Sequence, residues 1–469
     1  MQSERARRTY ALLVTTLSSF LTPFMASSIN LAVPAFGREL GATPVESTWV
    51  VSVYLVAAAA FLVPFGRLAD LVGRKRVFLA GCSLYAVASA LCALARSTRW
   101  LIALRGVQGV GGALLFGTAV AILTSVYPRE ERGRVLGVNT AAVYTGLSLG
   151  PVLGGWMTDQ LGWRSLFWVN AALGLGIAVL AILTLHGEWA GAVGERFDWG
   201  GALLYAVALV ALMYGVSSLQ GVRLAPYLAV GGLLGLVGFG ALQWRQAYPV
   251  LDLRRFRGNV PFIFSNLAAL IHYAATFALT YLLSRYLQEV HGISARQAGL
   301  ILLVQPALMA VLSPPAGWLS ERIEPRVLSS CGMGLMAVGL YGLSFFGAET
   351  PLAAVLWVQA LIGVGYALFS SPNTNAVMSS VAPRDYGVAS STLATMRMVG
   401  QASSMTIVLL ILSLELARAG QGTAFADALL ATMRTGFRLF TGLALVGMLA
   451  SLARGRVRDP SATRTEPLP

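Results

Sequence analysis

Long apolar runs recur along the whole chain and are separated by short polar segments. Runs of about 18 residues or more are long enough to cross about 30 Å of hydrocarbon as helices. We count about fourteen, at approximately 10–34, 47–68, 77–95, 100–125, 135–158, 164–185, 200–220, 226–244, 261–284, 298–320, 327–346, 352–378, 388–412 and 435–453. They lack the alternating pattern of barrel strands, and an open sheet would leave backbone groups unpaired in lipid. The pattern predicts an all-α integral membrane protein.

The composition supports this prediction and limits the function. Only 12% of the 469 residues are charged and 56% are hydrophobic, whereas soluble proteins carry about 25% charged residues. This excludes a soluble enzyme, a disordered chain and a disulfide-rich secreted module. His186, His272 and His291 form no ligand-spaced cluster. We therefore expect no metal site, no cofactor and no enzymatic activity, since no nucleophile and base stand at a useful spacing either.

The net charge of +14 is explained by membrane topology. With both termini in the cytoplasm, roughly 22 Lys and Arg residues fall on the cytoplasmic side and about 8 on the other, which follows the positive-inside rule. No nucleic-acid partner is needed to account for the charge. The first apolar run, from Tyr10, is too long for the core of a signal peptide. We expect a multi-pass protein of the cell membrane whose partner is the lipid bilayer.

Two pairs of similar segments indicate an internal duplication. Residues 64–70 are similar to residues 315–321, and residues 128–133 are similar to residues 383–387, about 254 residues later. We predict a six-helix N-terminal half at 1–190, two inserted helices at 191–248, and a six-helix C-terminal half with a short cytoplasmic tail at 249–469. Parallel repeats around a central pathway are an architecture of transporters.

Three motifs in the N-terminal half are rich in glycine. Segment 66–76 is a tight turn with Asp70 available to cap a helix or to pair with an arginine. Segment 104–113 contains Arg105, Gln108 and several glycines. In segment 146–155, small residues allow close helix packing and Pro151 removes a helical hydrogen bond. This last segment has two interpretations, tight packing and a hinge or seal between the halves, and we expect both.

These motifs resemble the signature loop, the helix-4 motif and the helix-5 antiporter motif of the major facilitator superfamily. Segments 163–170, 198–201 and 249–254 are similar to those of its fourteen-helix drug:proton antiporter branch, the EmrB/QacA-like group. The resemblance extends from about Phe24 to Gln401. It implies a major facilitator fold and conformational roles for Gly66, Asp70, Gly73, Arg74, Gly146, Gly150, Pro151, Gly154, Gly155, Gly317 and Glu321.

Two arginines lie inside predicted spans, where a charge is costly and indicates function. Arg105 precedes Gln108 by one turn, and its alternative role is to extend to the outer interface. The resemblance implies that Arg105 serves proton coupling or substrate binding. Arg397 lies near the middle of its span, with Gln401 on the same face. Further candidates for substrate binding or coupling lie on polar stripes, where interhelical hydrogen bonding is an equal alternative. They are Asn30, His272, Gln305, Gln359 and Asn373.

The chain departs from the resemblance in helix 1. Met25 stands where the branch usually carries an aspartate, and no other span has Asp or Glu near its middle. His272 is the only other titratable candidate, with a reference pKa of about 6.5. A cavity holding Arg105, Arg397 and His272 without a carboxylate favours anionic or neutral amphipathic substrates over lipophilic cations.

We therefore predict a monomeric secondary active transporter of the multidrug efflux type. It would move hydrophobic or amphipathic small molecules out of the cytoplasm by alternating access, with protons as the coupling ion but without the helix-1 carboxylate. The first alternative is an exporter or facilitator of an anionic amphiphile, a lipid or an endogenous metabolite without standard proton antiport. An alternative from another class is a membrane receptor that does not transport.

Overall fold

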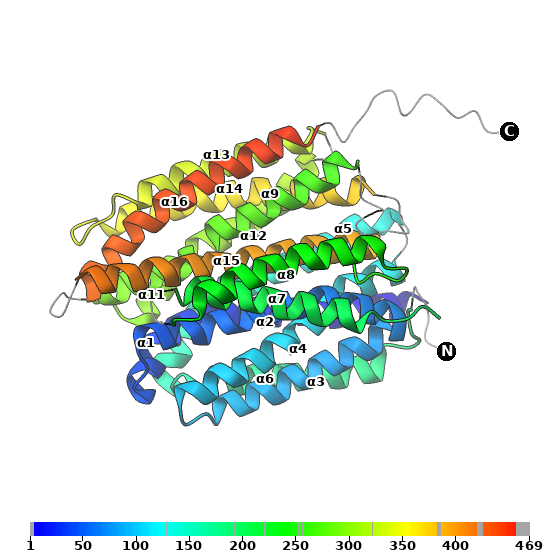
Figure 1. Cartoon of the computed structure of the whole chain (residues 1–469), viewed down its shortest axis with the longest axis horizontal. Helices are drawn as coiled ribbons and strands as arrows, with labels where there is room; N and C mark the ends of the chain where they lie inside the picture. The colour runs from blue at the N-terminus through cyan, green and yellow to red at the C-terminus, as the bar shows by residue number, and fades with distance from the viewer. Residues whose placement is uncertain are drawn as a thin grey trace.

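The computed structural model describes residues 4–127, 129–190, 194–219, 222–251, 254, 258–320, 322–381, 386–419 and 425–455. Every regular element within these ranges is a helix, and the long helices lie side by side in one bundle (Figure 1). The all-α prediction is confirmed.

The first eight long helices correspond one to one with the first eight predicted spans. They are α1 (Glu4–Leu40), α2 (Pro44–Val72), α3 (Arg74–Ala93), α4 (Thr98–Val126), α5 (Arg129–Leu161), α6 (Arg164–Thr184), α7 (Trp199–Ser217) and α8 (Ala225–Arg245). Little of the surface of α8 is covered by protein, whereas half of the apolar window of α7 is buried, because α7 packs on α8, α2 and α15.

The remaining six spans contain more elements than the hydrophobic pattern predicts. They are formed by α9 (Val260–Thr276), α10 (Ala278–Arg285), η2 (Tyr286–Val290), α11 (Ala295–Leu302), α12 (Val304–Ser320), α13 (Pro325–Leu343), α14 (Leu352–Ser379), α15 (Tyr386–Ala419) and α16 (Phe425–Ala453). Thirteen described segments are long and apolar enough to cross a membrane, among them 260–290 and 295–320 taken whole. With the 33-residue α5, the prediction of about fourteen spans is confirmed.

The two interrupted spans have identifiable breaks. Between α9 and α10 the N–H of Ala278 donates to Ser404 Oγ of α15 at 3.0 Å instead of to its own helix. Between α11 and α12, Pro306 cannot donate a hydrogen bond to the carbonyl one turn earlier and its ring crowds that carbonyl. Both features depend on single residues, so the apolar pattern of the span does not reveal them.

The helices pack as two groups that meet along two seams. Helix α1 packs on α5, and α4 on α2 and α3, while α14 packs on α12 and α13, and α9 on α15 and α16. Between the groups, α2 packs on α15, and α5 packs on α11 and α12. Each seam pairs the second span of one group with the fifth span of the other. The division at 1–190, 191–248 and 249–469 remains our prediction.

Both ends of the described bundle lie on one side. In Figure 1, α1 begins and α16 ends at the right of the view. We call this the terminal side. The opposite side, where α1 ends and α2 begins, is called the far side.

Candidate functional site

A cavity of about 150 Å³ lies between the two groups of helices. Three helices of each group line it: α1, α4 and α5 on one wall, and α9, α14 and α15 on the other. Its walls are mostly aromatic and aliphatic, with a few polar groups. The lining includes Ser19, Phe116, Asn139, Tyr144, Tyr273, Phe369, Ser370, Asn373 and Arg397. This combination is typical of a small-molecule site.

Arg397 is the charged group of this cavity. It lies in α15 and is partly exposed to the cavity. Its guanidinium lies 5.3 Å from the ring of Tyr273 and 6.0 Å from that of Phe116. Among the described residues it has no hydrogen-bond or ion-pair partner, and Nε is buried without one. An unpaired cation at this depth is expensive and is a functional feature by default.

Asn373 borders the cavity but its amide is already engaged. Its Nδ2 donates to the carbonyl of Ser265 at 3.1 Å, and its Oδ1 accepts from Arg454 at 3.0 Å. Arg454 lies just after α16 and is completely buried. It also donates to Ser265 Oγ at 3.2 Å, to the carbonyl of Pro325 at 3.2 Å and to Ser451 Oγ at 2.7 Å.

Arg454 is one of the roughly 22 basic residues that the positive-inside count places on the cytoplasmic side, but its side chain is buried rather than exposed there. Its side chain instead joins α9, α13, α14 and α16 at the terminal side. Burial lowers the pKa of Arg454 to about 10, and Glu324 opposes this shift. The guanidinium therefore stays charged at neutral pH.

His272 lies behind the cavity wall rather than in the cavity. It is fully buried in α9, stacked at 3.9 Å on Phe369 and at 4.4 Å and 4.9 Å from the rings of Tyr366 and Tyr273. Neither ring nitrogen has a hydrogen-bond partner among the described residues. An imidazole in such an aromatic enclosure has no acceptor for the proton of its charged form.

Arg105 is not brought together with Arg397, contrary to our expectation of a shared cavity. Its Nε donates to the carbonyl of Val50 at 3.1 Å, and its guanidinium lies 4.5 Å from the ring of Tyr54. A second nitrogen of Arg105 donates to Gln108, whose amide donates to Ser89 at 2.7 Å. These partners lie on α2, α3 and α4 itself, inside the N-terminal group. Phe116, which faces Arg397, lies three turns, or about 16 Å, further along α4.

The other polar candidates are dispersed. Gln359 donates to the carbonyl of Ile301 at 3.0 Å and so joins α14 to α11. Asn30 donates to the carbonyl of Ala26 at 3.3 Å, while its own Oδ1 is buried without a partner. Gln305 and Gln401 are buried but do not line the cavity. Only Arg397 and Asn373 among the nine candidates border it.

Tyr144 and Asn139 line the cavity and were missing from our candidates. Tyr144 donates from its hydroxyl to Ser370 of α14, which connects the two groups of helices. Asn139 Oδ1 is buried without a partner among the described residues. The sequence does contain an indication of their role. Asn139 and Tyr144 are polar positions five residues apart in the fifth span, just before the glycine motif. A search of that span for polar positions would have found them.

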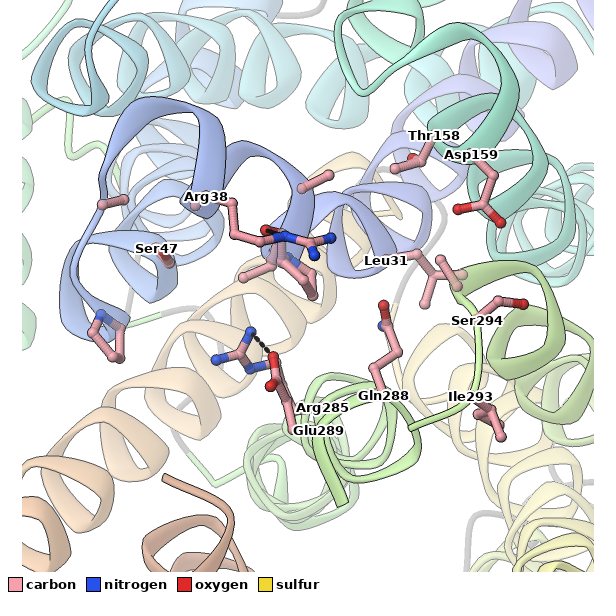
Figure 2. A pocket seen from close by; sticks show the side chains of 17 residues that line it. Leu31, Arg38, Ser47, Thr158, Asp159, Arg285, Gln288, Glu289, Ile293 and Ser294 are labelled. Carbon is pink, nitrogen blue, oxygen red and sulfur yellow. Dashed lines mark hydrogen bonds and ion pairs between the residues drawn. The ribbon is translucent and has the colours of Figure 1, made fainter. Parts of the chain in front are cut away.

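A second pocket, of about 610 Å³, opens on the far side. Figure 2 shows Arg38 and Asp159 on the wall formed by α1 and α5, and Arg285, Gln288 and Glu289 on the wall formed by α10 and η2. Arg285 pairs with Glu289 at 3.1 Å. This pocket therefore carries both signs of charge, unlike the cavity.

Close backbone contacts separate the second pocket from the cavity; we call them the far-side seal. It consists of Pro151, Gly155 and Asp159 of α5 with Ala295, Arg296 and Gly299 at α11. A Cβ on Gly155 would lie 2.8 Å from the carbonyl oxygen of Ala295, and one on Gly299 would lie 2.4 Å from that of Pro151. Asp159 accepts from the backbone N–H of Arg296 at 3.2 Å.

We expect Gly299→Ala to open the far-side seal, because its methyl group cannot fit against the Pro151 carbonyl without moving α11 from α5. Spin labels at Gln160 and Arg296, on a background without native cysteines, should report a longer distance by pulsed electron resonance. Gly176→Ala is the matched control, since a Cβ there meets nothing within 4 Å. An unchanged distance distribution in Gly299→Ala would contradict the assignment of the seal.

The other glycines of segment 146–155 face α1. A Cβ on Gly146 would lie 2.5 Å from the carbonyl oxygen of Phe20, one on Gly150 would lie 1.8 Å from Ser27 Oγ, and one on Gly154 would lie 2.7 Å from Ser28 Cβ. Gly155 alone among the four faces the C-terminal group. The motif therefore combines close packing within one group with a contact between groups.

The loop between α2 and α3 is held by ion pairs and caps. Asp70 pairs with Arg74 at 2.8 Å, and Arg74 also donates to the carbonyl of Ala121 in α4 at 3.2 Å. Gly73 has φ +119°, which favours glycine, and a Cβ there would overlap Glu188. Glu188 in turn accepts from the N–H of Lys75 at 2.8 Å.

Of the three remaining motif positions, the structure describes Gly66 and Gly317 but not Glu321. Gly66 lies opposite Gly117 of α4: its Cα lies 3.8 Å from the position where a Cβ on Gly117 would stand. Gly317 faces Ser371 of α14. Glu321 lies outside the described residues. In the described part of the chain no three His, Cys, Asp or Glu residues form a group that could hold a metal ion.

No carboxylate is buried among the described residues. Every described Asp and Glu lies in a loop or within about one turn of the end of its helix. Met25, at the position of the expected aspartate, is buried in the apolar core. The charge of Arg397 is therefore not neutralised within the membrane-spanning region that the structure describes.

Comparison with known proteins identifies the family. The model of the Major Facilitator Superfamily matches residues 15–405 and, separately, 265–468. The chain is similar to the cephamycin export protein CmcT of Amycolatopsis lactamdurans, with 33% identity over 92% of this chain and 89% of that protein. It is also similar to the multidrug resistance protein Stp of Mycobacterium tuberculosis strain H37Rv, with 32% identity over 85% of this chain and 74% of that protein.

The fold is shared with solved transporters. A bacterial homologue of the human drug peptide transporters PepT1 and PepT2 superposes with a TM-score of 0.66, at 18% identity, over 95% of this chain and 98% of the other. Together with the match to the family model, this places the fourteen spans in a known architecture. The chain belongs to the Major Facilitator Superfamily of transporters.

Proposed function

We propose that this transporter exports amphipathic small molecules that carry a negative charge, from the cytoplasm across the cell membrane. The observation that carries the proposal is the position of Arg397. Its guanidinium borders a cavity between the two groups of helices and lacks a hydrogen-bond or ion-pair partner among the described residues. A carboxylate, sulfonate or phosphate of a substrate would supply the missing acceptor, and such charge-assisted hydrogen bonds are strong.

The walls around Arg397 suit the apolar part of such a substrate. Phe116, Tyr144, Tyr273 and Phe369 offer aromatic faces, and only a few polar side chains interrupt them. A cavity of about 150 Å³ would enlarge as the walls separate around a drug-sized molecule. The names of two relatives, a cephamycin export protein and a multidrug resistance protein, support efflux as the direction of transport.

In our proposal the protein works as a monomer by alternating access and belongs to the fourteen-helix branch. The structure would be the state that faces the cytoplasm, because the far-side seal is closed and the cavity lies nearer the terminal side. Release would require α5 to separate from α11. The glycines of the fifth span and the Asp70–Arg74 loop would then be the elements that hold or release each state.

Transport by purified protein in proteoliposomes tests the proposal. The probes are taurocholate, a bile salt with a permanent sulfonate, and ethidium, a permanent aromatic cation. We expect wild-type protein to move taurocholate and to discriminate against ethidium by tenfold or more, because a cation would meet Arg397 without a carboxylate to offset it. Robust ethidium flux with no taurocholate flux would show that the proposal is wrong.

A further inference from the structure

The energy source of transport is constrained by where the titratable groups lie. Exchange of a proton for a substrate requires a group that binds the proton and is reached alternately from both sides. A carboxylate near the end of a helix is reached from one side only. All described carboxylates lie in loops or within about one turn of a helix end, so none of them meets this requirement.

His272 does not fill the role of the missing carboxylate. Its own helix places Tyr273 beside it, and α14 places Tyr366 and Phe369. On α15, the cation of Arg397 lies 5.3 Å from the ring of Tyr273. At the end of α16, Arg454 bonds to Ser265, which lies two turns from His272 on α9. A protonated His272 would be a second buried cation without an acceptor.

The charge of an anionic substrate offers another source of energy. Over a complete cycle Arg397 returns to its starting position, so the net charge moved is that of the substrate. Because the cell interior is electrically negative, the membrane potential favours outward movement of an anion. A monovalent anion would reach a tenfold concentration ratio for every 59 mV or so of potential.

We propose that this protein is an electrogenic exporter of amphipathic anions, driven by the membrane potential with no coupled proton. The proposal rests on the anionic substrate proposed above. It predicts that a potential alone concentrates the substrate and that a pH gradient alone does not. It also predicts that the steady-state ratio of substrate inside to outside a vesicle is the same for both orientations of the protein in the membrane, because a uniporter has no preferred direction.

Proteoliposomes with tritiated taurocholate test this inference. Valinomycin and a tenfold inward potassium gradient make the interior positive, and we expect taurocholate to accumulate about tenfold inside at steady state. With valinomycin and equal potassium on both sides, which holds the potential at zero, a pH gradient of one unit should give no accumulation. Protein-free vesicles are the control and should show neither. Vesicles with Arg397→Gln should approach the same tenfold ratio about 10- to 100-fold more slowly.

The outcomes separate this inference from the proposed function. Accumulation driven by the pH gradient at zero potential would overturn the uniport mechanism while leaving the anionic substrate in place. Flux that appears only when taurocholate is present on both sides would also overturn it, because it indicates an exchanger. Absence of any taurocholate movement by wild-type protein that transports ethidium would overturn both proposals.

Discussion

Arg397→Gln should lower taurocholate transport by about 10- to 100-fold. The estimate follows from the loss of a charge-assisted interaction with the substrate, about 1.5–3 kcal/mol, at 1.4 kcal/mol for each factor of ten. Initial rates in proteoliposomes at several substrate concentrations measure the effect. Arg397→Lys keeps the charge but loses the planar fork of the guanidinium, so we expect it to retain a larger share of the activity than Arg397→Gln.

The same substitution should not destabilise the protein, and this distinguishes a binding role from a structural one. Arg397 has no hydrogen-bond or ion-pair partner among the described residues, so its removal leaves no group unsatisfied and relieves the cost of an unpaired charge. We expect an unchanged or higher Tm for Arg397→Gln in detergent. Unimpaired transport, or a Tm lowered together with the activity, would contradict the assignment.

The large-scale fold was predictable from the sequence because a bilayer imposes simple requirements. A span must be apolar over about 30 Å and must satisfy its own backbone, so hydropathy alone indicates helices and their number. The breaks at Ala278 and Pro306 were not predictable in the same way. The break at Ala278 depends on the hydroxyl of Ser404, which is 126 residues away in the sequence. No local sequence pattern in α9 predicts this break.

Arg105 and Arg397 show how far the candidate site could be predicted from the sequence. Both are arginines inside apolar spans, and the sequence does not indicate which of them faces the other group of helices. Which face of a helix turns towards the seam depends on the packing of its neighbours. Arg105 contacts Val50 and Tyr54 of α2, within one group of helices. Arg397 of α15 instead lines the cavity between the two groups.

Arg454 shows the opposite error, a residue that looks like a surface charge and is buried. It follows the last apolar run, where basic residues normally anchor a span at the cytoplasmic surface. Its burial depends on Ser265, Pro325 and Asn373, which lie on three other helices. A positive-inside count cannot separate an anchoring arginine from one that is enclosed by the fold.

The burial of Arg454 gives the largest expected effect on stability. Arg454→Gln should destabilise the folded protein by roughly 2–4 kcal/mol, because Asn373 Oδ1 and the Pro325 carbonyl would lose buried donors and each unsatisfied group costs about 1–3 kcal/mol. Thermal unfolding in detergent should show a Tm lower by several degrees. The matched control is Arg245→Gln, at the exposed end of α8, whose Tm should stay at the wild-type value.

Equal Tm values for the two variants would mean that the hydrogen bonds of Arg454 do not hold the C-terminal group together. The expected pattern is the reverse of that for Arg397, where transport falls and stability does not. Arg454 has hydrogen-bond partners on four helices, whereas Arg397 has no hydrogen-bond or ion-pair partner among the described residues.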